Sequence, residues 1–475
     1  MRRVQRLKRR RPAGRPRGRV GATAAATGAC AVLFLAALPG QSAAAADGPG
    51  SYAFQPGAQR IAGAATTSDA KAIRAGSTYR DTIRLDGKLI YRVDLDAKTN
   101  AYVSAVAVPG SGAKVAYGDK IEVSLQNRDG INCSSNNAQF GPSTEYPRPL
   151  AAYAYRTVDP TSPLCQEAGT YYVVIERTGG DDAADDPWEL EIRDVAEPGL
   201  SAAGPTRPPE NWPSASPAPL VAEPRQRAGG AGFSDATSLT RGEWATKIEP
   251  GQSLFYRVPV DWGQQLFTSV DLGSSGGTGY VGGALSVALY NPARGLVDSS
   301  DSLSYDGKQK TTSLPPLPPV AYENRFDPSS GDKDMRFAGW YYLRVSLSPE
   351  VGKTFGDKAY GLTLETNVKG NATSGPGYAG PAGDFAVTDD DREAATDGRS
   401  AAGAAGPDGT MRLVGFAGIG AGTVLVLMLG VWTLLARRRA AGAAGAAGPA
   451  GAAGAAGPAG QEPGAGQGFG PPPAW

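Results

Sequence analysis

The chain repeats one strand-like sequence about 170 residues apart, and this repeat limits the folds open to it. "GTYYVVIERT" occupies residues 169–178, and "GWYYLRVSLS" occupies residues 339–348. Both begin with Gly, place a Tyr pair at the third and fourth positions, and continue into β-branched or other apolar residues. Such runs favour extended strands.

Further matches keep the same order along both halves of the chain. Three of them stand out: SDA at 68–70 and 234–236, YRV at 91–93 and 256–258, and WELEI at 188–192 with YGLTL at 360–364. The offset drifts by only a few residues, as loop insertions between fixed strands would produce. The sequence therefore predicts two copies of one domain.

Apolar residues alternate with polar residues in these segments. In "YRVDL", Tyr91, Val93 and Leu95 share one face of an extended chain, and Arg92 and Asp94 share the other. This period of two indicates strands with one buried and one solvated face. No long amphipathic helix pattern occurs outside the apolar stretch near the C-terminus. We therefore expect an all-β fold of two antiparallel β-sandwiches.

The repeated pattern resembles the bacterial pre-peptidase C-terminal (PPC) domain. The resemblance rests on G-x-x-x-x-Y-R-V-x-(V/L), which begins at Gly251 and, one residue shorter, at Gly87. It also rests on G-(T/W)-Y-Y-(V/L)-x-(I/V), which begins at Gly169 and Gly339. The family implies a small jelly-roll-like sandwich attached to secreted proteins, often peptidases. Because no catalytic domain precedes either copy, we expect an accessory role and no peptidase activity.

Both ends of the chain carry membrane signals. A basic run, an apolar segment and small residues follow one another in the order of a secretory signal peptide, with cleavage near Ala44 or Ala46. An uncleaved signal anchor is the alternative. Residues 413–436 carry no charge and are long enough to cross a bilayer, which needs about 20 residues. Three Arg residues follow them and predict a cytoplasmic C-terminus, hence a single-pass type I protein of the cell membrane whose bulk is extracellular.

These patterns divide the chain into eight segments. We expect a signal peptide (1–46), a flexible N-terminal segment (47–65), the first sandwich (66–195), a Pro-rich linker (196–232), the second sandwich (233–368), a flexible stalk (369–412), a transmembrane helix (413–436) and a Gly/Ala/Pro-rich disordered cytoplasmic tail (437–475).

The cysteine, histidine and acidic residues limit the redox, catalytic and metal-binding chemistry that the chain can perform. Cys133 and Cys165 remain after signal cleavage, and in an oxidising compartment they predict a disulfide, with two free thiols as the alternative. The chain has 0 His, which excludes His-dependent nucleophilic catalysis and His metal sites. The acidic runs at 181–186 and 388–393 offer Ca²⁺-type oxygen ligands without EF-hand spacing. We predict that they are solvated surface, and we expect no metal and no cofactor.

Two Pro-rich stretches contain the candidate binding residues. "PRPLAAYAYR" and "PPLPPVAYENR" each give Ala-Tyr followed by Arg three residues after the Tyr, which singles out Tyr153 and Arg156, and Tyr322 and Arg325. Tyr and Arg are enriched in binding hot spots. The alternative is a structural loop or extra strand present in both copies, with the Tyr packed against the sandwich.

The functional expectation is a non-enzymatic bacterial cell-surface protein. Its sandwiches would bind or scaffold an extracellular protein or an envelope polymer, and the net charge of +1 gives no argument for nucleic acid. One alternative is an accessory subunit of a membrane complex, assembled through a helix in which Gly418 and Gly422 have helix-packing spacing. Another is an envelope hydrolase that uses paired carboxylates. No residue is predicted to be catalytic.

Overall fold

The computed structural model describes residues 51–404, except 160, 161, 163 and 181. The predicted signal peptide, transmembrane helix and cytoplasmic tail lie outside these residues. No helix in the described part of the chain is both long and apolar enough to cross a membrane.

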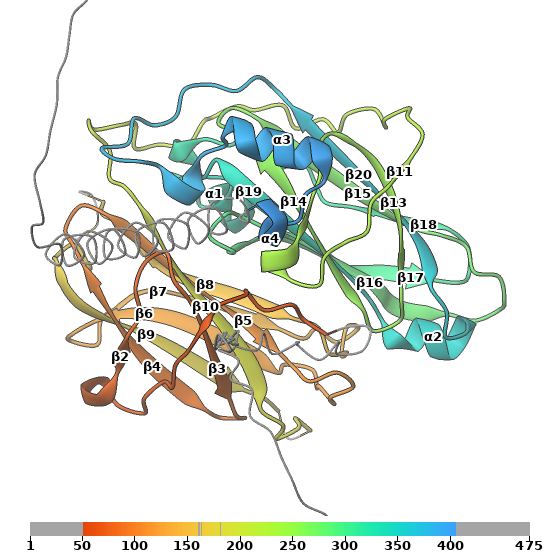
Figure 1. The fold of residues 1–475 in the computed structure, drawn as a ribbon, viewed down its shortest axis with the longest axis horizontal. Helices are drawn as coiled ribbons and strands as arrows, with labels where there is room; N and C mark the ends of the chain where they lie inside the picture. Colours follow the sequence, from red (N-terminus) through yellow and green to blue (C-terminus); the bar gives the residue numbers. More distant parts are fainter. Residues whose placement is uncertain (1–50, 160–161, 163, 181, 405–475) are drawn as a thin grey trace, which may run out of the picture. The chain divides into compact units, whose positions relative to one another are not determined.

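The described residues confirm the all-β expectation, with four five-stranded sheets (Figure 1). The first sandwich contains β1 (Gln59–Arg60), β2 (Lys71–Ala72), β3 (Thr78–Ile83), β4 (Lys88–Leu95), β5 (Asn100–Val108), β6 (Lys120–Asn127), β7 (Asn132–Gln139), β8 (Leu150–Arg156), β9 (Gly169–Thr178) and β10 (Trp188–Glu197). The second contains β11 (Arg225–Gln226), β12 (Thr237–Ser238), β13 (Gly242–Ile248), β14 (Ser253–Val260), β15 (Gln265–Leu272), β16 (Val281–Tyr290), β17 (Leu296–Tyr305), β18 (Lys310–Ser313), β19 (Gly339–Leu347) and β20 (Tyr360–Lys369).

The helices are short. They are η1 (Thr67–Asp69), η2 (Phe233–Asp235), η3 (Tyr322–Phe326), α1 (Ser330–Asp334), α2 (Pro349–Phe355), η4 (Gly383–Phe385), α3 (Asp389–Asp397) and α4 (Ala401–Ala404).

The two sandwiches share one topology. Sheet A1 has the order β1-β3-β10-β5-β8 and sheet B1 the order β2-β4-β9-β6-β7; sheets A2 and B2 have the orders β11-β13-β20-β15-β18 and β12-β14-β19-β16-β17. Adding ten to each strand number of the first sandwich therefore gives the second. The residue register also repeats, since Tyr91 pairs with Val173 and Tyr256 with Leu343. The shared register makes any residue of one copy comparable with its equivalent in the other.

Each sandwich has its own core between its two sheets. Tyr91, Val93 and Trp188 belong to the first core, and Tyr256 and Trp244 belong to the second. The alternation read from "YRVDL" is confirmed, because Arg92 and Asp94 on the opposite face are exposed. Close packing repeats as well: a Cβ on Gly63 would lie 2.9 Å from Tyr91 Cζ, and one on Gly229 would lie 2.8 Å from Tyr256 Cζ.

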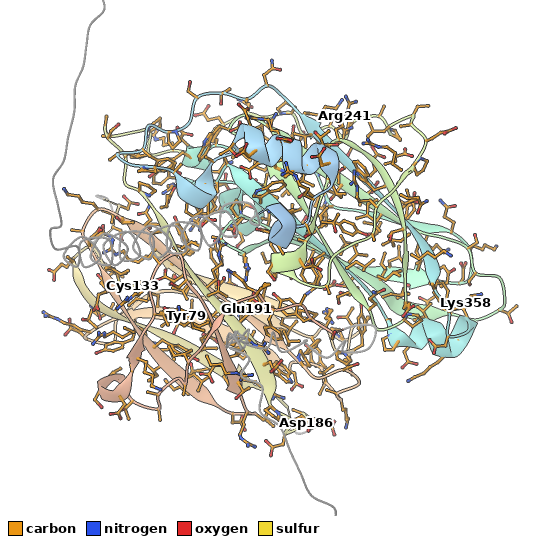
Figure 2. All side chains as sticks on the ribbon, in the orientation of Figure 1. Tyr79, Cys133, Asp186, Glu191, Arg241 and Lys358 are labelled. Atoms are coloured by element: carbon orange, nitrogen blue, oxygen red, sulfur yellow. A yellow bond between two sulfur atoms is a disulfide. The ribbon has the colours of Figure 1, made fainter. Side chains whose placement is uncertain are left out.

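The predicted disulfide is present. Cys133 lies in β7, and Cys165 lies in the loop before β9 (Figure 2). The bond closes a separation of 32 residues, a length at which a cross-link stabilises a fold by about 3 kcal/mol or more. In the second sandwich the corresponding strand, β17, carries no Cys.

Parts of the segments expected to be flexible pack on the sandwiches, while other parts, such as 201–206 and 371–375, are exposed. At the N-terminus, Tyr52 is buried, and Ala53 N donates to Ala231 O over 3.1 Å. The linker also makes contacts, since Leu200 forms a β-bridge with Tyr378. These contacts place residues from before, between and after the two sandwiches against each other.

Part of the predicted stalk, within 376–404, also packs on the sandwiches. Phe385 is fully buried, and the helix α3 begins with a capping box between Thr388 and Asp391. Trp340 Nε1 of β19 donates to Asp391 Oδ1 over 2.8 Å. The Gly/Ala/Asp composition suggested flexibility, but a few aromatic and charged contacts hold this segment in place.

Candidate functional site

The sandwiches meet through the outer face of sheet A1 and the outer face of sheet B2. Val106 and Ala151 of A1 pack in one buried cluster with Phe255, Tyr290 and Tyr342 of B2. A second buried cluster joins Tyr102 and Tyr153 of A1 to Phe337 and Phe385. The strands β5 and β16 are therefore buried on both faces, as their near-continuous apolar sequences indicate.

Differences between the copies account for the choice of these faces. At equivalent outward positions, B1 carries Ile90, Asp94 and Thr170, whereas B2 carries Phe255, Pro259 and Trp340. In the same way A1 carries Tyr153, Glu191 and Glu197, whereas A2 carries Ser313, Thr363 and Lys369. Only one face of each copy has the apolar and acidic residues that the interface uses.

The first of three polar clusters in this interface is centred on Glu191 of β10. Its carboxylate is fully buried and lies 2.5 Å from Arg294 Nη1 of the second sandwich. Tyr52 OH and Gln55 N also donate to it, over 3.1 and 2.6 Å. Burial is the largest single effect and would lower the pKa of Arg294, but Glu191 together with Tyr52 and Tyr342 outweighs it, and the pKa is raised. Arg294 is therefore held in its charged form beside the Glu191 carboxylate.

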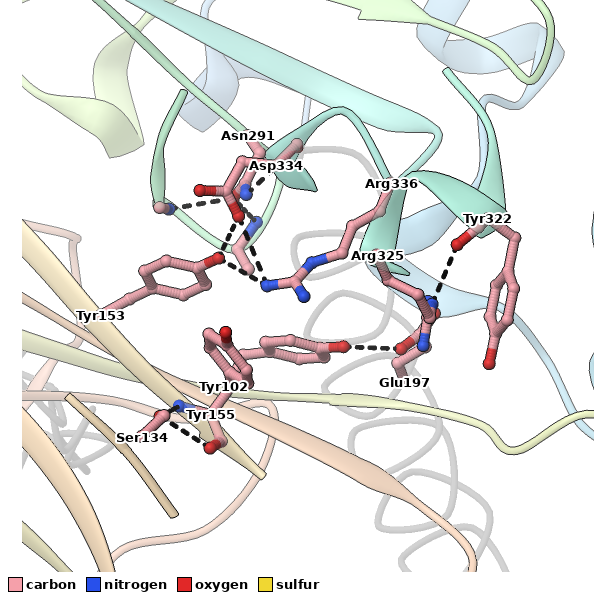
Figure 3. Close-up of polar contacts among 12 residues, drawn as sticks. Tyr102, Ser134, Tyr153, Tyr155, Glu197, Asn291, Tyr322, Arg325, Asp334 and Arg336 are labelled. Atoms are coloured by element: carbon pink, nitrogen blue, oxygen red, sulfur yellow. Dashed lines mark hydrogen bonds and ion pairs between the residues drawn. The ribbon is translucent and has the colours of Figure 1, made fainter. Parts of the chain in front are cut away.

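The second cluster is centred on Glu197 at the end of β10 (Figure 3). Arg325 Nη2 donates to its Oε1 over 2.7 Å, and Tyr378 OH donates to the same oxygen over 2.7 Å. Tyr102 OH and Asn100 Nδ2 donate to Oε2 over 2.8 and 2.6 Å. Burial opposes ionisation, yet Arg325 and these donors lower the pKa of Glu197 below its usual value.

The third cluster joins Tyr153 of β8 to Asp334 and Arg336 (Figure 3). Tyr153 OH donates to Asp334 Oδ1 and accepts from Arg336 Nη2 over 2.6 Å. The Arg336 guanidinium also lies over the ring of Tyr155, 4.5 Å from its centroid. All three polar side chains are at least nine-tenths buried.

Charged clusters of this kind determine how the sandwiches pack more than they add net stability. Removing water from each charge costs several kcal/mol, which the pairing offsets. Any other arrangement of the sandwiches would leave these charges buried without partners, so the clusters favour one arrangement.

Three of the four predicted binding residues lie at the interface between the sandwiches, and the fourth, Arg156, lies within the first sandwich. Tyr153 and Arg325 belong to the interface clusters, and the ring of Tyr322 lies beneath the Arg325 guanidinium, 3.3 Å from it. Arg156 is 1% exposed and donates to the carbonyl oxygens of Thr99 and Asp96. Their side chains thus contact other parts of this chain.

The two Ala-Tyr stretches are not equivalent in the fold. Tyr153 lies in β8, whose equivalent is β18, and the shared register aligns it with Ser313. Tyr322 lies in η3, a helix without a counterpart among the described residues of the first sandwich. The two stretches are similar in sequence but lie in different elements. The prediction that their Tyr residues are equivalent was wrong because sequence similarity alone does not give the strand register.

A cavity of about 770 Å³ lies at one edge of the interface, and we call it the junction cavity. The first sandwich contributes the loops at 108–115 and 142–149. The second contributes residues around Pro250 and residues 348–353. Six prolines line the cavity and stiffen its walls: Pro109, Pro142, Pro147, Pro149, Pro250 and Pro349. Sequence reasoning missed the cavity because its walls come from loops more than 100 residues apart.

One buried carboxyl in the described chain stands apart from these ion pairs. Asp194 of β10 faces the core side of sheet A1, is 3% exposed, and its Oδ1 has no hydrogen-bond partner among the described residues. Burial raises its pKa to about 7. The equivalent residue, Thr366, is satisfied, since it accepts from Trp244 Nε1 and donates to Thr240 O.

The acidic runs give no metal site in the described residues. No group of three or more potential ligands comes together there. Asp391 of the second run caps α3, and Arg392 bridges Asp389 and Asp261. Asp181, in the first run, is outside the described residues.

Comparisons with known proteins do not identify a family. No family model and no curated protein matches the chain. Among solved structures, an arabinose-bound α-L-arabinofuranosidase shares 14% identity over 26% of this chain and 18% of its own, with a TM-score of 0.16. A tandem pair of CBM22 domains from Paenibacillus barcinonensis shares 11% over 63% and 89%, with a TM-score of 0.16. The CUB1-EGF-CUB2 region of human MASP-1/3 shares 8% over 61% and 99%, with a TM-score of 0.17. Similarity this weak supports no inference about function.

Proposed function

We propose that this protein is a non-catalytic, single-pass cell-surface protein whose paired sandwiches bind or scaffold an extracellular partner or envelope polymer. The observation that supports this proposal is the junction cavity, because both sandwiches build its walls. A binding site made by two domains is maintained only if the domains keep one arrangement. The buried clusters around Glu191, Glu197 and Asp334 favour one arrangement.

The buried titratable groups of the interface also fit a binding role better than catalysis. Glu191 and Glu197 are neutralised by Arg294 and Arg325 and are enclosed by hydrogen-bond donors. A general acid or base needs access to its substrate. These side chains instead hold the two sandwiches together.

Two glycine substitutions test the proposal as a matched pair. A Cβ at Gly110, which lines the junction cavity, or at Gly361 of β20 would meet no atom within 4 Å. Gly110→Trp should therefore fill the cavity, and Gly361→Trp should leave it open. We expect the purified full chain and its Gly361→Trp variant to bind isolated envelope saturably, and the Gly110→Trp variant to bind much more weakly. Equal binding by both variants would refute the cavity as the site, and no binding by the unmodified chain would refute the function.

A further inference from the structure

The wall of the junction cavity contains a buried positive charge. Arg148 lines the cavity and is 4% exposed. Its Nη1 donates to Thr144 O over 2.5 Å, and its Nη2 donates to Thr144 Oγ1 over 3.1 Å. Aromatic rings flank the guanidinium, with centroids 5.0 Å away at Phe140 and 5.1 Å away at Tyr146. These neighbours orient the charge, but none of them neutralises it.

A second buried guanidinium lies close by. Arg344 of β19 is 4% exposed and donates to Pro149 O and to Ser286 Oγ. Burial first, and then the charge of Arg344, lower the pKa of Arg148. The nearest carboxylate to Arg148 in the described chain is Asp301, with Oδ2 3.9 Å from Nη2 and its side chain 40% exposed. Among the described residues, therefore, neither buried guanidinium has a buried carboxylate as a partner.

This arrangement differs from the other interface clusters. Arg294, Arg325 and Arg336 each have a buried carboxylate as a partner. At the rim of the junction cavity, Lys114 and Lys353 are balanced in number by Glu145 and Glu350, and Glu350 pairs with Lys353 over 2.6 Å. Arg148 therefore leaves the cavity with an excess of positive charge. A buried charge whose nearest counter-charge is half-exposed is costly, and an anionic ligand would lower that cost.

We propose that the junction cavity binds an anionic group, a carboxylate or phosphate, carried on a saccharide-sized unit of an envelope polymer; this inference rests on the binding function proposed above. The volume of about 770 Å³ lies within the range of small-molecule sites, roughly 300–1,000 Å³. The guanidinium charge of Arg148 in the cavity wall attracts a carboxylate or a phosphate. Ser111, Ser143 and Ser253 add neutral hydrogen-bonding groups to the lining.

Four soluble probes test the inference by titration calorimetry on the purified full chain. Trigalacturonate and galactotriose have the same sugar backbone and differ in their carboxylates, and a glycerol phosphate trimer supplies phosphate. We expect at least one of the two anionic probes to bind about tenfold or more tightly than galactotriose, and its affinity to fall as salt rises. The tighter of the two identifies the source of the anionic group. Equal affinity for all three overturns the inference, as does tighter binding of a triglutamate peptide.

Substitutions at Gly110 test whether the charge acts inside the cavity. Gly110→Glu and Gly110→Gln have nearly the same shape, and a side chain at this position starts in open space. We expect Gly110→Glu to weaken binding of the anionic probe about tenfold relative to Gly110→Gln, through like-charge repulsion. Equal binding by the two variants overturns the inference.

Removing the charge of Arg148 provides the second variant. Arg148→Gln should abolish the preference for anionic probes, and Arg241→Gln, at an exposed position of the second sandwich, should preserve it. A melting curve of each variant separates loss of binding from loss of folding, and the Gly110 pair decides the question if Arg148→Gln unfolds. Suppose that Gly110→Trp blocks envelope binding but that no anionic probe binds more tightly than galactotriose. This result would overturn the inference of an anionic ligand and leave the proposed function intact.

Discussion

At the scale of single residues, the two copies differ in whether a buried polar side chain at the same position has a hydrogen-bond partner. Thr366 and Asp194 occupy equivalent sites, but only Thr366 is hydrogen-bonded through its side chain to neighbours in its own copy. The same position of the shared fold thus holds a hydrogen-bonded hydroxyl in one copy and a buried carboxyl group in the other.

Asp194 predicts a pH dependence of stability. Its pKa is raised from 3.8 to about 7 in the folded chain, so the folded state retains a proton that the unfolded state has already lost between those values. The free energy of unfolding should therefore fall as pH rises from about 4 to about 7, by up to roughly 4 kcal/mol, and level off above. Asp194→Thr should remove this contribution and be the more stable form at pH 8. Urea unfolding of both chains at pH 5 and pH 8 measures it, and an unchanged difference between the two chains at both pH values would contradict it.

Arg294 predicts a large loss of stability for a single substitution. Arg294→Met leaves the Glu191 carboxylate buried without its counter-charge, which should lower the free energy of unfolding by about 3–5 kcal/mol. Arg241→Met, at an exposed position, should change it by no more than about 0.5 kcal/mol. Denaturant unfolding compares the two, and similar values for both substitutions would show that the Glu191 cluster does not hold the interface.

At the scale of elements, the strands and the connecting segments differ in what the sequence could predict. Alternation identified β4 and β14 because one face of each strand packs in a core. The segments around Tyr52 and Phe385 have no periodicity, and their order comes from contacts with residues far away in the chain. Local patterns cannot encode such contacts, so composition alone suggested flexibility.

The docked C-terminal segment predicts a measurable cost for Phe385→Ala. The Phe385 ring lies 4.6 Å from Phe337 and 5.8 Å from Tyr102, centroid to centroid, and is fully buried. Its removal should lower the free energy of unfolding by about 3–5 kcal/mol, as for other buried Phe residues. Tyr117→Ala, at a 59% exposed position, is the control. If Phe385 lay in a flexible stalk, both substitutions would have equally small effects.

At the scale of the whole molecule, the repeat was predictable and the packing of its copies was not. The strand sequences that recur in both halves predicted the order of the elements. Insertions between the copies lengthen loops and do not change the pairing register of the strands. The interface residues were visible as differences between the copies, such as Trp340 in place of Thr170. Their meaning required knowing which faces meet, which depends on strand register. For the same reason Tyr153 and Tyr322 were paired as equivalents although they occupy different elements.

The two sandwiches form one unit held by a buried interface, and calorimetric unfolding of the full chain tests this most directly. We predict a single heat-absorption peak for the sandwiches, with the calorimetric enthalpy close to the van't Hoff enthalpy, as for a cooperative transition. Arg294→Met combined with Glu197→Gln should weaken the interface and split the peak in two. Two separate peaks in the unmodified chain, unaffected by these substitutions, would show that the sandwiches unfold independently and would contradict the account.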